Sequence, residues 1–334
     1  MNLFEPILNQ MIYLFGFIII GYVLYKLKAV PDNAMTSLSR LESMLFIPCL
    51  VLGTFIESFT VEKLAISGTL FLISAAMLLI MIPVAILISR LIYRGDEYLQ
   101  KIATYGLTFA NFGYMGNAVM QAVFPDIFAE YLIFVMPLWI GIYTWAVPTL
   151  LIGNESTDAK KSEDGKRRIT LSDIGRRLKP LLNPMFIAML IGMVLGLTGV
   201  GKYIPQSVMS IVTVSGNCMS PIAMLLTGMT VAASDIKILL SKPKTYILSA
   251  IRLLCIPLVF LLVFSILPKG EVFSDTFFTC AMCALAMPLG LNTIVVPKGY
   301  GKDTTDAAGM ALISHTLSIA TIPLIFYLFE LLVL

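Results

Sequence analysis

The chain alternates between long apolar runs and short polar stretches. Each apolar run is about twenty residues long, the length that a helix needs to cross the hydrocarbon core of a membrane. Ten such runs are predicted as spans: 6–27, 38–56, 66–92, 99–123, 129–152, 181–200, 208–232, 246–267, 276–296 and 307–334. The pattern therefore predicts an all-α polytopic membrane protein with ten transmembrane helices.

The composition agrees with this pattern. Apolar residues make up 58% of the chain and charged residues only 13%, whereas charged residues approach a quarter of a soluble domain. The first apolar run has no basic residues before it and no small-residue cleavage site after it, so we expect a retained helix and not a signal peptide. The composition excludes an ordinary soluble protein, and we expect membrane lipids and no nucleic acid among its partners.

The placement of the basic residues predicts the orientation. If the N-terminus lies outside, all but three of the 23 Lys and Arg residues fall in or near the inward-facing connections, the exceptions being Lys63, Lys202 and Lys269. Basic residues are enriched in cytoplasmic loops. We therefore expect a multi-pass protein of the cell membrane with both termini extracytoplasmic.

One long charged segment divides the spans five and five. We expect residues 1–152 to form a first repeat, 153–180 a cytoplasmic linker and 181–334 a second repeat. Prolines recur in the same order in both halves, including Pro148 and Pro323 in the last span of each. Because five is odd, the second copy enters from the opposite side, which predicts the inverted repeat of many alternating-access carriers.

Two polar, glycine-bearing interruptions lie at matching places, in the fourth and ninth spans. They are residues 111–117 (NFGYMGN) and 286–292 (AMPLGLN). In hydrocarbon, irregular backbone survives only against protein or a water-filled cavity, and paired interruptions of this kind point to a transporter's binding site. Glycine and proline open the helix, and amide side chains satisfy freed backbone groups or hold a polar ligand. The predicted substrate-binding residues at the interruptions are Asn111, Gly113, Tyr114, Asn117, Pro288, Gly290 and Asn292.

Further candidates lie in other spans. Asn217 and Ser220, just before Pro221 in the seventh span, are predicted to line the substrate side of the scaffold. His315, the only histidine, is a candidate for proton coupling because titratable groups inside membranes are usually functional; the alternative is a neutral ring bonded to Ser314 or Ser318. Glu42 is a second candidate, although it could instead pair with Arg252 or extend to the membrane interface.

No metal site or cofactor is expected. Cys280 and Cys283 form a C-x-x-C pattern, but within an apolar span they suggest small-residue packing. The fourth and ninth spans carry no deep acidic residue, so coupling to sodium is less expected than coupling to protons. The chain has one histidine and no paired intramembrane carboxylates, which argues against an intramembrane enzyme.

Four segments together carry a family resemblance. These are NFGYMGN, LNP at 182–184, SPIAMLLTG at 220–228, and MPLGLN at 287–292 followed by KGYG at 298–301. They resemble the auxin efflux carrier family over nearly the whole chain. The resemblance implies a fold related to bile-acid symporters and sodium–proton antiporters, with fourth and ninth helices that cross, and a homodimer formed through the scaffold. Plant members carry a much longer central loop, so the chain resembles a prokaryotic-type member with substrates such as malate or malonate.

Together these features predict a secondary transporter, an efflux-type carrier of small organic anions such as dicarboxylates or auxin-like carboxylates, working by alternating access. Two alternatives stay open from the sequence. An anion channel would also use polar breaks and amide groups, and a ligand sensor could retain a carrier fold without transporting.

Overall fold

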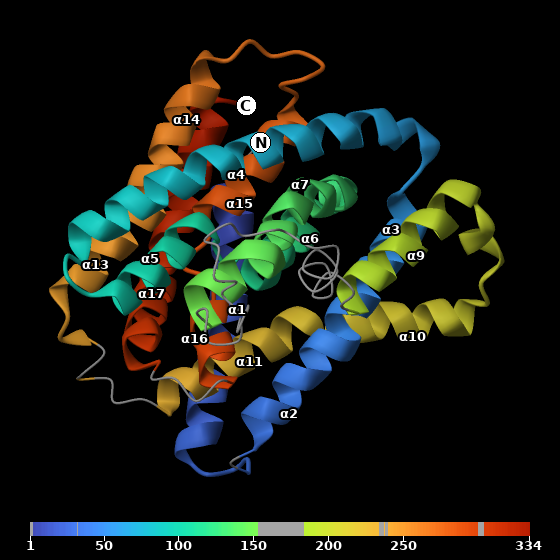
Figure 1. The fold of residues 1–334 in the computed structure, drawn as a ribbon. Helices are drawn as coiled ribbons and strands as arrows, with labels where there is room; N and C mark the ends of the chain where they lie inside the picture. The colour runs from blue at the N-terminus through green and yellow to red at the C-terminus, as the bar shows by residue number, and fades with distance from the viewer. Residues whose placement is uncertain (1–2, 32, 153–183, 234–236, 238–239, 300–303) are drawn as a thin grey trace, which may run out of the picture.

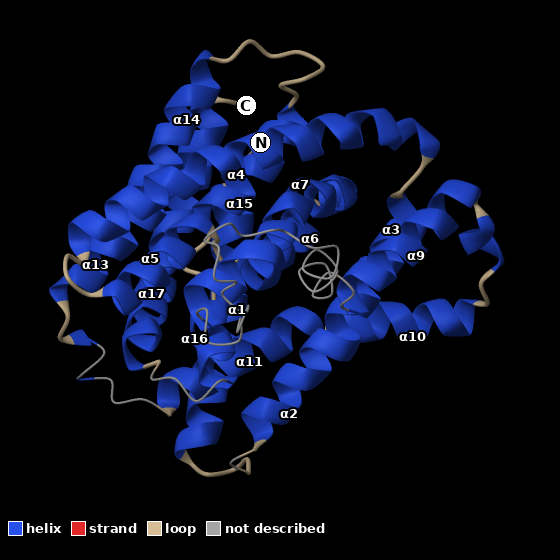
Figure 2. Cartoon of the chain, in the orientation of Figure 1, coloured by secondary structure: helices blue, strands red, loops and turns tan. Residues whose placement is uncertain are grey.

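The computed structural model describes residues 3–31, 33–152, 184–233, 237, 240–299 and 304–334. The regular elements in this part of the chain are all helices, joined by loops, with one isolated backbone bridge and no strand (Figure 2). The elements of the first half are α1 (Phe4–Lys26), α2 (Ala34–Leu41), η1 (Glu42–Phe46), α3 (Ile47–Ser58), α4 (Val61–Ile92), α5 (Glu97–Thr108), η2 (Phe112–Gly116), α6 (Asn117–Val123), η3 (Pro125–Ile127), α7 (Phe128–Gly141) and η4 (Ile142–Ile152). Those of the second half are α9 (Pro184–Thr198), η7 (Val200–Tyr203), α10 (Gln206–Asn217), α11 (Met219–Ala232), α13 (Pro243–Ala250), η8 (Ile251–Cys255), α14 (Ile256–Ile266), α15 (Asp275–Ala286), α16 (Asn292–Gly299) and α17 (Thr305–Leu332).

Seven helical stretches of the described chain are long and apolar enough to cross a membrane: Phe4–Lys26, Ala34–Ser58, Ser67–Ile92, Pro125–Leu151, Gln206–Ala232, Pro243–Ile266 and Thr305–Leu332. They match seven of the ten predicted spans. The other three predicted spans correspond to shorter helices: α9 and the two broken pairs α5–α6 and α15–α16. The predicted linker at 153–180 lies outside the described residues. The protein is thus a polytopic membrane protein, while the count of ten spans and the inverted repeat stay predictions.

Proline positions account for two local distortions of the helices. The π-helical segments η1 and η8 are each followed at the same distance by a proline, Pro48 and Pro257. Proline donates no backbone hydrogen bond, so the carbonyl four residues earlier loses its partner and the preceding turn widens. Glu42 and Arg252 lie in these widened turns, and both are buried.

Glycine residues allow close packing between α1 and α11 and between α3 and α9. A Cβ atom added at Gly21 of α1 would lie 2.2 Å from the carbonyl oxygen of Leu225, and one added at Gly228 of α11 would lie 1.9 Å from that of Ile18. Such contacts bring helix backbones together where water cannot drive association. The same device joins α3 to α9, where a Cβ at Gly196 would lie 2.4 Å from the Phe55 carbonyl oxygen.

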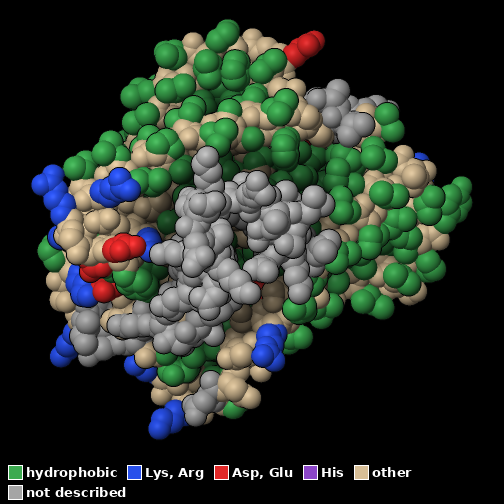
Figure 3. All heavy atoms as spheres, in the orientation of Figure 1, with side chains coloured by type: hydrophobic (Ala, Val, Ile, Leu, Met, Phe, Trp, Pro, Cys, Tyr) green, Lys and Arg blue, Asp and Glu red, His purple; other side chains and the backbone are tan. Residues whose placement is uncertain are grey.

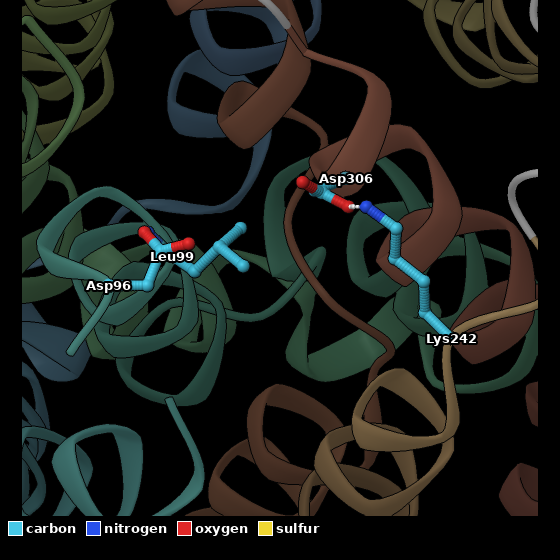
Figure 4. Close-up of polar contacts among 4 residues, drawn as sticks. All are labelled: Asp96, Leu99, Lys242 and Asp306. Carbon is cyan, nitrogen blue, oxygen red and sulfur yellow. Dashed lines mark hydrogen bonds and ion pairs between the residues drawn. The ribbon is translucent and has the colours of Figure 1, made fainter. Parts of the chain in front are cut away.

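The two termini lie on one side of the molecule (Figure 1). The backbone N–H of Leu3 donates to Glu330 Oε2 at 2.7 Å, which ties the start of α1 to the end of α17. At the other end of α17, Lys242 forms an ion pair with Asp306, and Asp96 caps α5 by accepting from the Leu99 N–H at 2.9 Å (Figure 4). On the face drawn in Figure 3, Lys and Arg side chains gather away from the termini, and apolar side chains cover much of the remainder. On this face the basic side chains of the described residues therefore lie away from the termini.

Candidate functional site

The two predicted interruptions are breaks in the helices, and they contact one another. Helix α5 ends at Thr108 and η2 begins at Phe112, while α15 ends at Ala286 and α16 begins at Asn292. Between them, Ala110 and Leu289 form an antiparallel bridge, and the Asn111 N–H donates to the Pro288 carbonyl oxygen at 2.7 Å. The two extended stretches thus provide backbone hydrogen-bond partners for one another, which irregular backbone inside a membrane requires. We call this region the crossing, defined as residues 109–117 and 286–292.

Two glycines permit the close approach of the chains at the crossing. A Cβ at Gly290 would lie 2.8 Å from the Phe109 carbonyl oxygen, and one at Gly113 would lie 2.5 Å from a ring carbon of Trp139. Real Cβ atoms do not approach backbone oxygens or rigid rings so closely. Gly290 must be a glycine because the two backbones meet there. Gly113 must be a glycine because the indole ring of Trp139 packs directly against the first break at that position.

His315 reaches the first break from α17. Its Nδ1 lies 2.7 Å from the Ala311 carbonyl oxygen, and its Nε2 lies 3.0 Å from Asn111 Nδ2. A carbonyl only accepts hydrogen bonds, so Nδ1 carries a proton; Nε2 then accepts from the amide of Asn111 in a neutral ring. The expected alternative of a bond from the ring to Ser314 or Ser318 was wrong, because Ser318 donates instead to the His315 backbone carbonyl oxygen.

Asn292, the first residue of α16, is held by an aromatic hydroxyl. Its Nδ2 donates to Tyr105 Oη at 3.0 Å. The other two predicted asparagines are buried, and the side-chain oxygens of Asn111 and Asn117 have no hydrogen-bond partner within the described structure. The crossing therefore holds polar groups whose hydrogen-bonding capacity is not fully used.

A small cavity lies at the crossing. It is lined by Tyr105, Ala110, Asn111, Phe112, Gly113, Tyr114, Trp139, Ile142, Gly290, Leu291 and Asn292. Its volume of about 10 Å³ admits about one water molecule. In this conformation the breaks are therefore too tightly packed to hold an organic anion, and access requires the surrounding helices to move.

Glu42 lies in a second small cavity next to the first break. Its neighbours there include Ser39, Tyr114 and Thr227. The side chain is buried, and neither carboxyl oxygen has a hydrogen-bond partner among the described residues. Tyr114 lines both cavities and so connects the Glu42 site to the crossing.

Arg252 does not pair with Glu42, and both side chains are buried within the protein instead of extending to its surface, so both expectations for this pair were wrong. The Arg252 guanidinium is buried and donates three hydrogen bonds to backbone carbonyl oxygens: Nη1 to Leu107 at 3.1 Å, Nη2 to Ala284 at 3.2 Å and Nε to Met287 at 3.1 Å. One side chain from η8 thus holds the ends of both α5 and α15. An arginine inside a span usually indicates function, but the sequence did not indicate these backbone partners.

The two candidates in the seventh span line neither the cavity at the crossing nor the Glu42 cavity. Asn217, at the end of α10, is exposed, and its Oδ1 accepts from Gln121 Nε2 at 3.3 Å. Ser220 is buried, with a weak contact of 3.9 Å to the sulfur of Met219. Helix α11 instead contributes Ala223, Leu226, Thr227 and Thr230 to the Glu42 cavity.

The sequence reasoning missed Tyr105 and Trp139. Both side chains line the cavity at the crossing. Tyr105 precedes the first break by less than two helical turns, so one face of α5 brings its hydroxyl to Asn292; hydropathy alone carries no signal for this. Trp139 belongs to α7, and one of only two tryptophans in the chain could have been weighed as a candidate.

Comparison with known proteins agrees with this architecture. A search among curated proteins gives no significant match. The family model described as "Membrane transport protein" matches residues 6–326, which include every helix that contributes to the crossing. The resemblance to auxin efflux carriers is confirmed at this level, because the matched model represents that family of transporters. The chain therefore belongs to the membrane transport protein family.

Proposed function

We propose that this protein is an efflux-type carrier of small organic anions that works by alternating access. The observation that carries the proposal is the contact between two broken helices at which the amides of Asn111 and Asn292 are each held by a side chain from another segment. Broken helices near the middle of the membrane present the positive ends of their second halves to anionic groups. Amide N–H groups beside these ends suit a carboxylate.

The proposed substrate site is the crossing itself. The carboxylate would accept hydrogen bonds from the side chains of Asn117 and Asn292 and from the first N–H groups of η2. At the start of α16 the N–H groups of Thr293 and Ile294 already donate to the carbonyl oxygens of Gly290 and Leu291, so Asn292 contributes there through its side chain. Because the cavity of about 10 Å³ is too small for an organic acid, binding requires the mobile helices to separate. Such a closed site favours a carrier over an anion channel, which needs a continuous open path.

The membrane potential would drive export. If the connections rich in Lys and Arg face the cytoplasm, as such connections usually do, both termini are extracytoplasmic. Moving one negative charge outward then releases about 2.3 kcal/mol per 100 mV. The proposal includes ten spans arranged as two inverted repeats, a homodimer in the cell membrane, and a prokaryotic-type member of the family.

Proton coupling would act through His315 or Glu42. When His315 binds a second proton, its Nε2 becomes a donor, and the Asn111 amide must rotate to present its oxygen. The Asn111 N–H then becomes available to the substrate. Glu42 offers a different route, because a buried carboxylate without a partner is costly and is relieved by binding a proton. A sodium ion is the less favoured partner.

Counterflow in proteoliposomes tests the proposed site. The purified protein would be assayed with malate, malonate, citrate and indole-3-acetate, and with neutral amide analogues of the acids. We expect saturable exchange of at least one carboxylate, exchange that is about tenfold slower or worse in Asn117→Ala and Asn292→Ala, and no effect in the control Asn33→Ala, an exposed position outside the crossing. Unchanged exchange in both site variants would reject the assignment, and flux that never saturates would favour a channel.

A further inference from the structure

The carbonyl oxygens bound by Arg252 belong to two helix ends that would otherwise be unsatisfied. The last four carbonyl oxygens of a helix accept no hydrogen bond from within that helix. Leu107 lies in the last turn of α5, and Ala284 lies in the last turn of α15. Met287 is the residue that follows α15. Each helix end also carries a negative partial charge from the aligned peptide dipoles. Two negative ends therefore meet at the crossing, and one guanidinium binds both.

No carboxylate neutralises Arg252 within the described part of the chain. The ion pairs found there join Lys101 to Glu97, Lys242 to Asp306 and Lys269 to Asp275. The positive charge of Arg252 is thus balanced by backbone carbonyls and helix ends. A buried charge requires such compensation, and three hydrogen bonds to carbonyls provide it without a counter-ion.

Secondary transporters commonly place a bound cation at this type of position. Unwound carbonyls and the C-terminal ends of half-helices coordinate the coupling sodium ion or proton in several folds. We propose that Arg252 is a built-in cation that takes the place of a coupling ion at the crossing. It acts as a positioning residue: it holds the ends of α5 and α15 together during transport and makes the closed crossing independent of sodium.

The surroundings of Arg252 allow this proposal to be tested by removing the side chain. The guanidinium borders a cavity that is also lined by Ser74 and Thr108, and the hydroxyl of Ser74 has no hydrogen-bond partner among the described residues. Without the arginine, three carbonyl oxygens and nearby hydroxyls would surround an empty space. Carbonyl and hydroxyl oxygens are suitable ligands for a hard cation. Removal of Arg252 should therefore create a site that an added cation can fill.

Thermal unfolding of the full-length protein in detergent provides the test. Tryptophan fluorescence is a suitable signal because Trp139 lies at the crossing. The variants are Arg252→Ala, Arg252→Met, Arg252→Lys and the exposed control Arg94→Ala. Each is measured in sodium chloride and in choline chloride, and in choline chloride with millimolar guanidinium chloride or urea, far below denaturing concentrations. Urea is the matched probe, since it has nearly the same shape and similar N–H donors but no charge.

We expect the unmodified protein and Arg94→Ala to have the same Tm in sodium and in choline. Arg252→Ala should lose at least about 5 °C, recover part of that loss with guanidinium but not with urea, and be more stable in sodium than in choline. Arg252→Lys should lie above Arg252→Met, which fills similar space without charge. Equal effects of guanidinium and urea, equal stability of the Lys and Met variants, or Arg252→Ala as stable as Arg94→Ala would each overturn the proposal.

The transport reading of this inference rests on the proposed carrier function, but the unfolding measurements do not. If Arg252→Ala shows the cation-dependent Tm while the unmodified protein exchanges no anion, the role of Arg252 stands and the proposed substrate class fails. If exchange by the unmodified protein occurs and requires sodium, the carrier function stands and the built-in cation is rejected.

Discussion

The side chain of Asn111 donates a hydrogen bond of 3.0 Å to Nε2 of His315, which lies 204 positions further along the chain. This contact joins the first helix break to the last transmembrane helix. Both residues are buried, and no charged side chain contacts the imidazole among the described residues. The protonation state of one ring therefore decides whether Asn111 presents an N–H or an oxygen to the crossing.

Replacing His315 by glutamine should remove a pH-dependent step. Glutamine can still accept a hydrogen bond from Asn111, but it does not titrate. We expect the exchange rate of the unmodified carrier to change as the medium is acidified from about pH 8 to about pH 4, because a second proton on the buried ring reverses the bond to Asn111, and that of His315→Gln to stay flat. Counterflow rates measured across this range check the prediction. A His315→Gln profile that follows the unmodified protein would retire His315 as a coupling residue.

Glu42→Gln separates the second proton candidate from the first. Glutamine keeps the shape of a protonated carboxyl group but cannot release a proton. If Glu42 carries the proton, anion counterflow should persist in this variant, while acidification that accompanies net transport should disappear. A pH-sensitive dye inside the vesicles measures this. Glu57→Gln, an exposed position on α3, serves as the control. Undiminished acidification in Glu42→Gln would exclude this residue.

The bond between Asn292 and Tyr105 should be important for substrate affinity. Tyr105→Phe removes the hydroxyl that accepts from Asn292 and leaves the amide free to turn away from the proposed site. We expect a weaker effect than in Asn292→Ala, about threefold to tenfold on the apparent KM, in keeping with one hydrogen bond of about 1 kcal/mol. The double variant should be no worse than Asn292→Ala alone, because the tyrosine would act only through the amide. Additive losses would contradict this dependence.

Helix packing away from the crossing should be sensitive to a single methyl group. Gly228→Ala would place a Cβ 1.9 Å from the Ile18 carbonyl oxygen, so α11 must move away from α1. Overpacking of this kind costs about 1–3 kcal/mol, and we expect a Tm several degrees lower. At Gly16 of the same helix pair a Cβ would meet nothing within 4 Å. Gly16→Ala should be neutral or stabilising by about 0.5–1 kcal/mol; a similar loss in both variants would show that the close contact is not the cause.

Much of the architecture could be predicted because a membrane imposes simple local requirements. Apolar runs of sufficient length predicted the positions of the helices, and all seven continuous spans were found close to the predicted limits. Glycine, proline and asparagine predicted both breaks because a helix that loses backbone bonds within a membrane needs those residues. The pairing of Glu42 with Arg252 was wrong for the converse reason: opposite charge in two spans does not determine which face each helix turns to the other.

The sequence by itself determined the class of protein and the placement of the breaks. Each of these follows from local requirements: a segment in lipid needs an apolar surface of sufficient length and hydrogen-bond partners for its backbone. Only the tertiary structure decided which distant side chains form hydrogen bonds at the breaks. His315 bonds to Asn111, Tyr105 bonds to Asn292, and Arg252 bonds to the carbonyl oxygens at the ends of α5 and α15. Open helix ends accept any donor of suitable geometry, so the choice among many candidate donors depends on how the helices pack, and hydropathy and spacing do not contain that information.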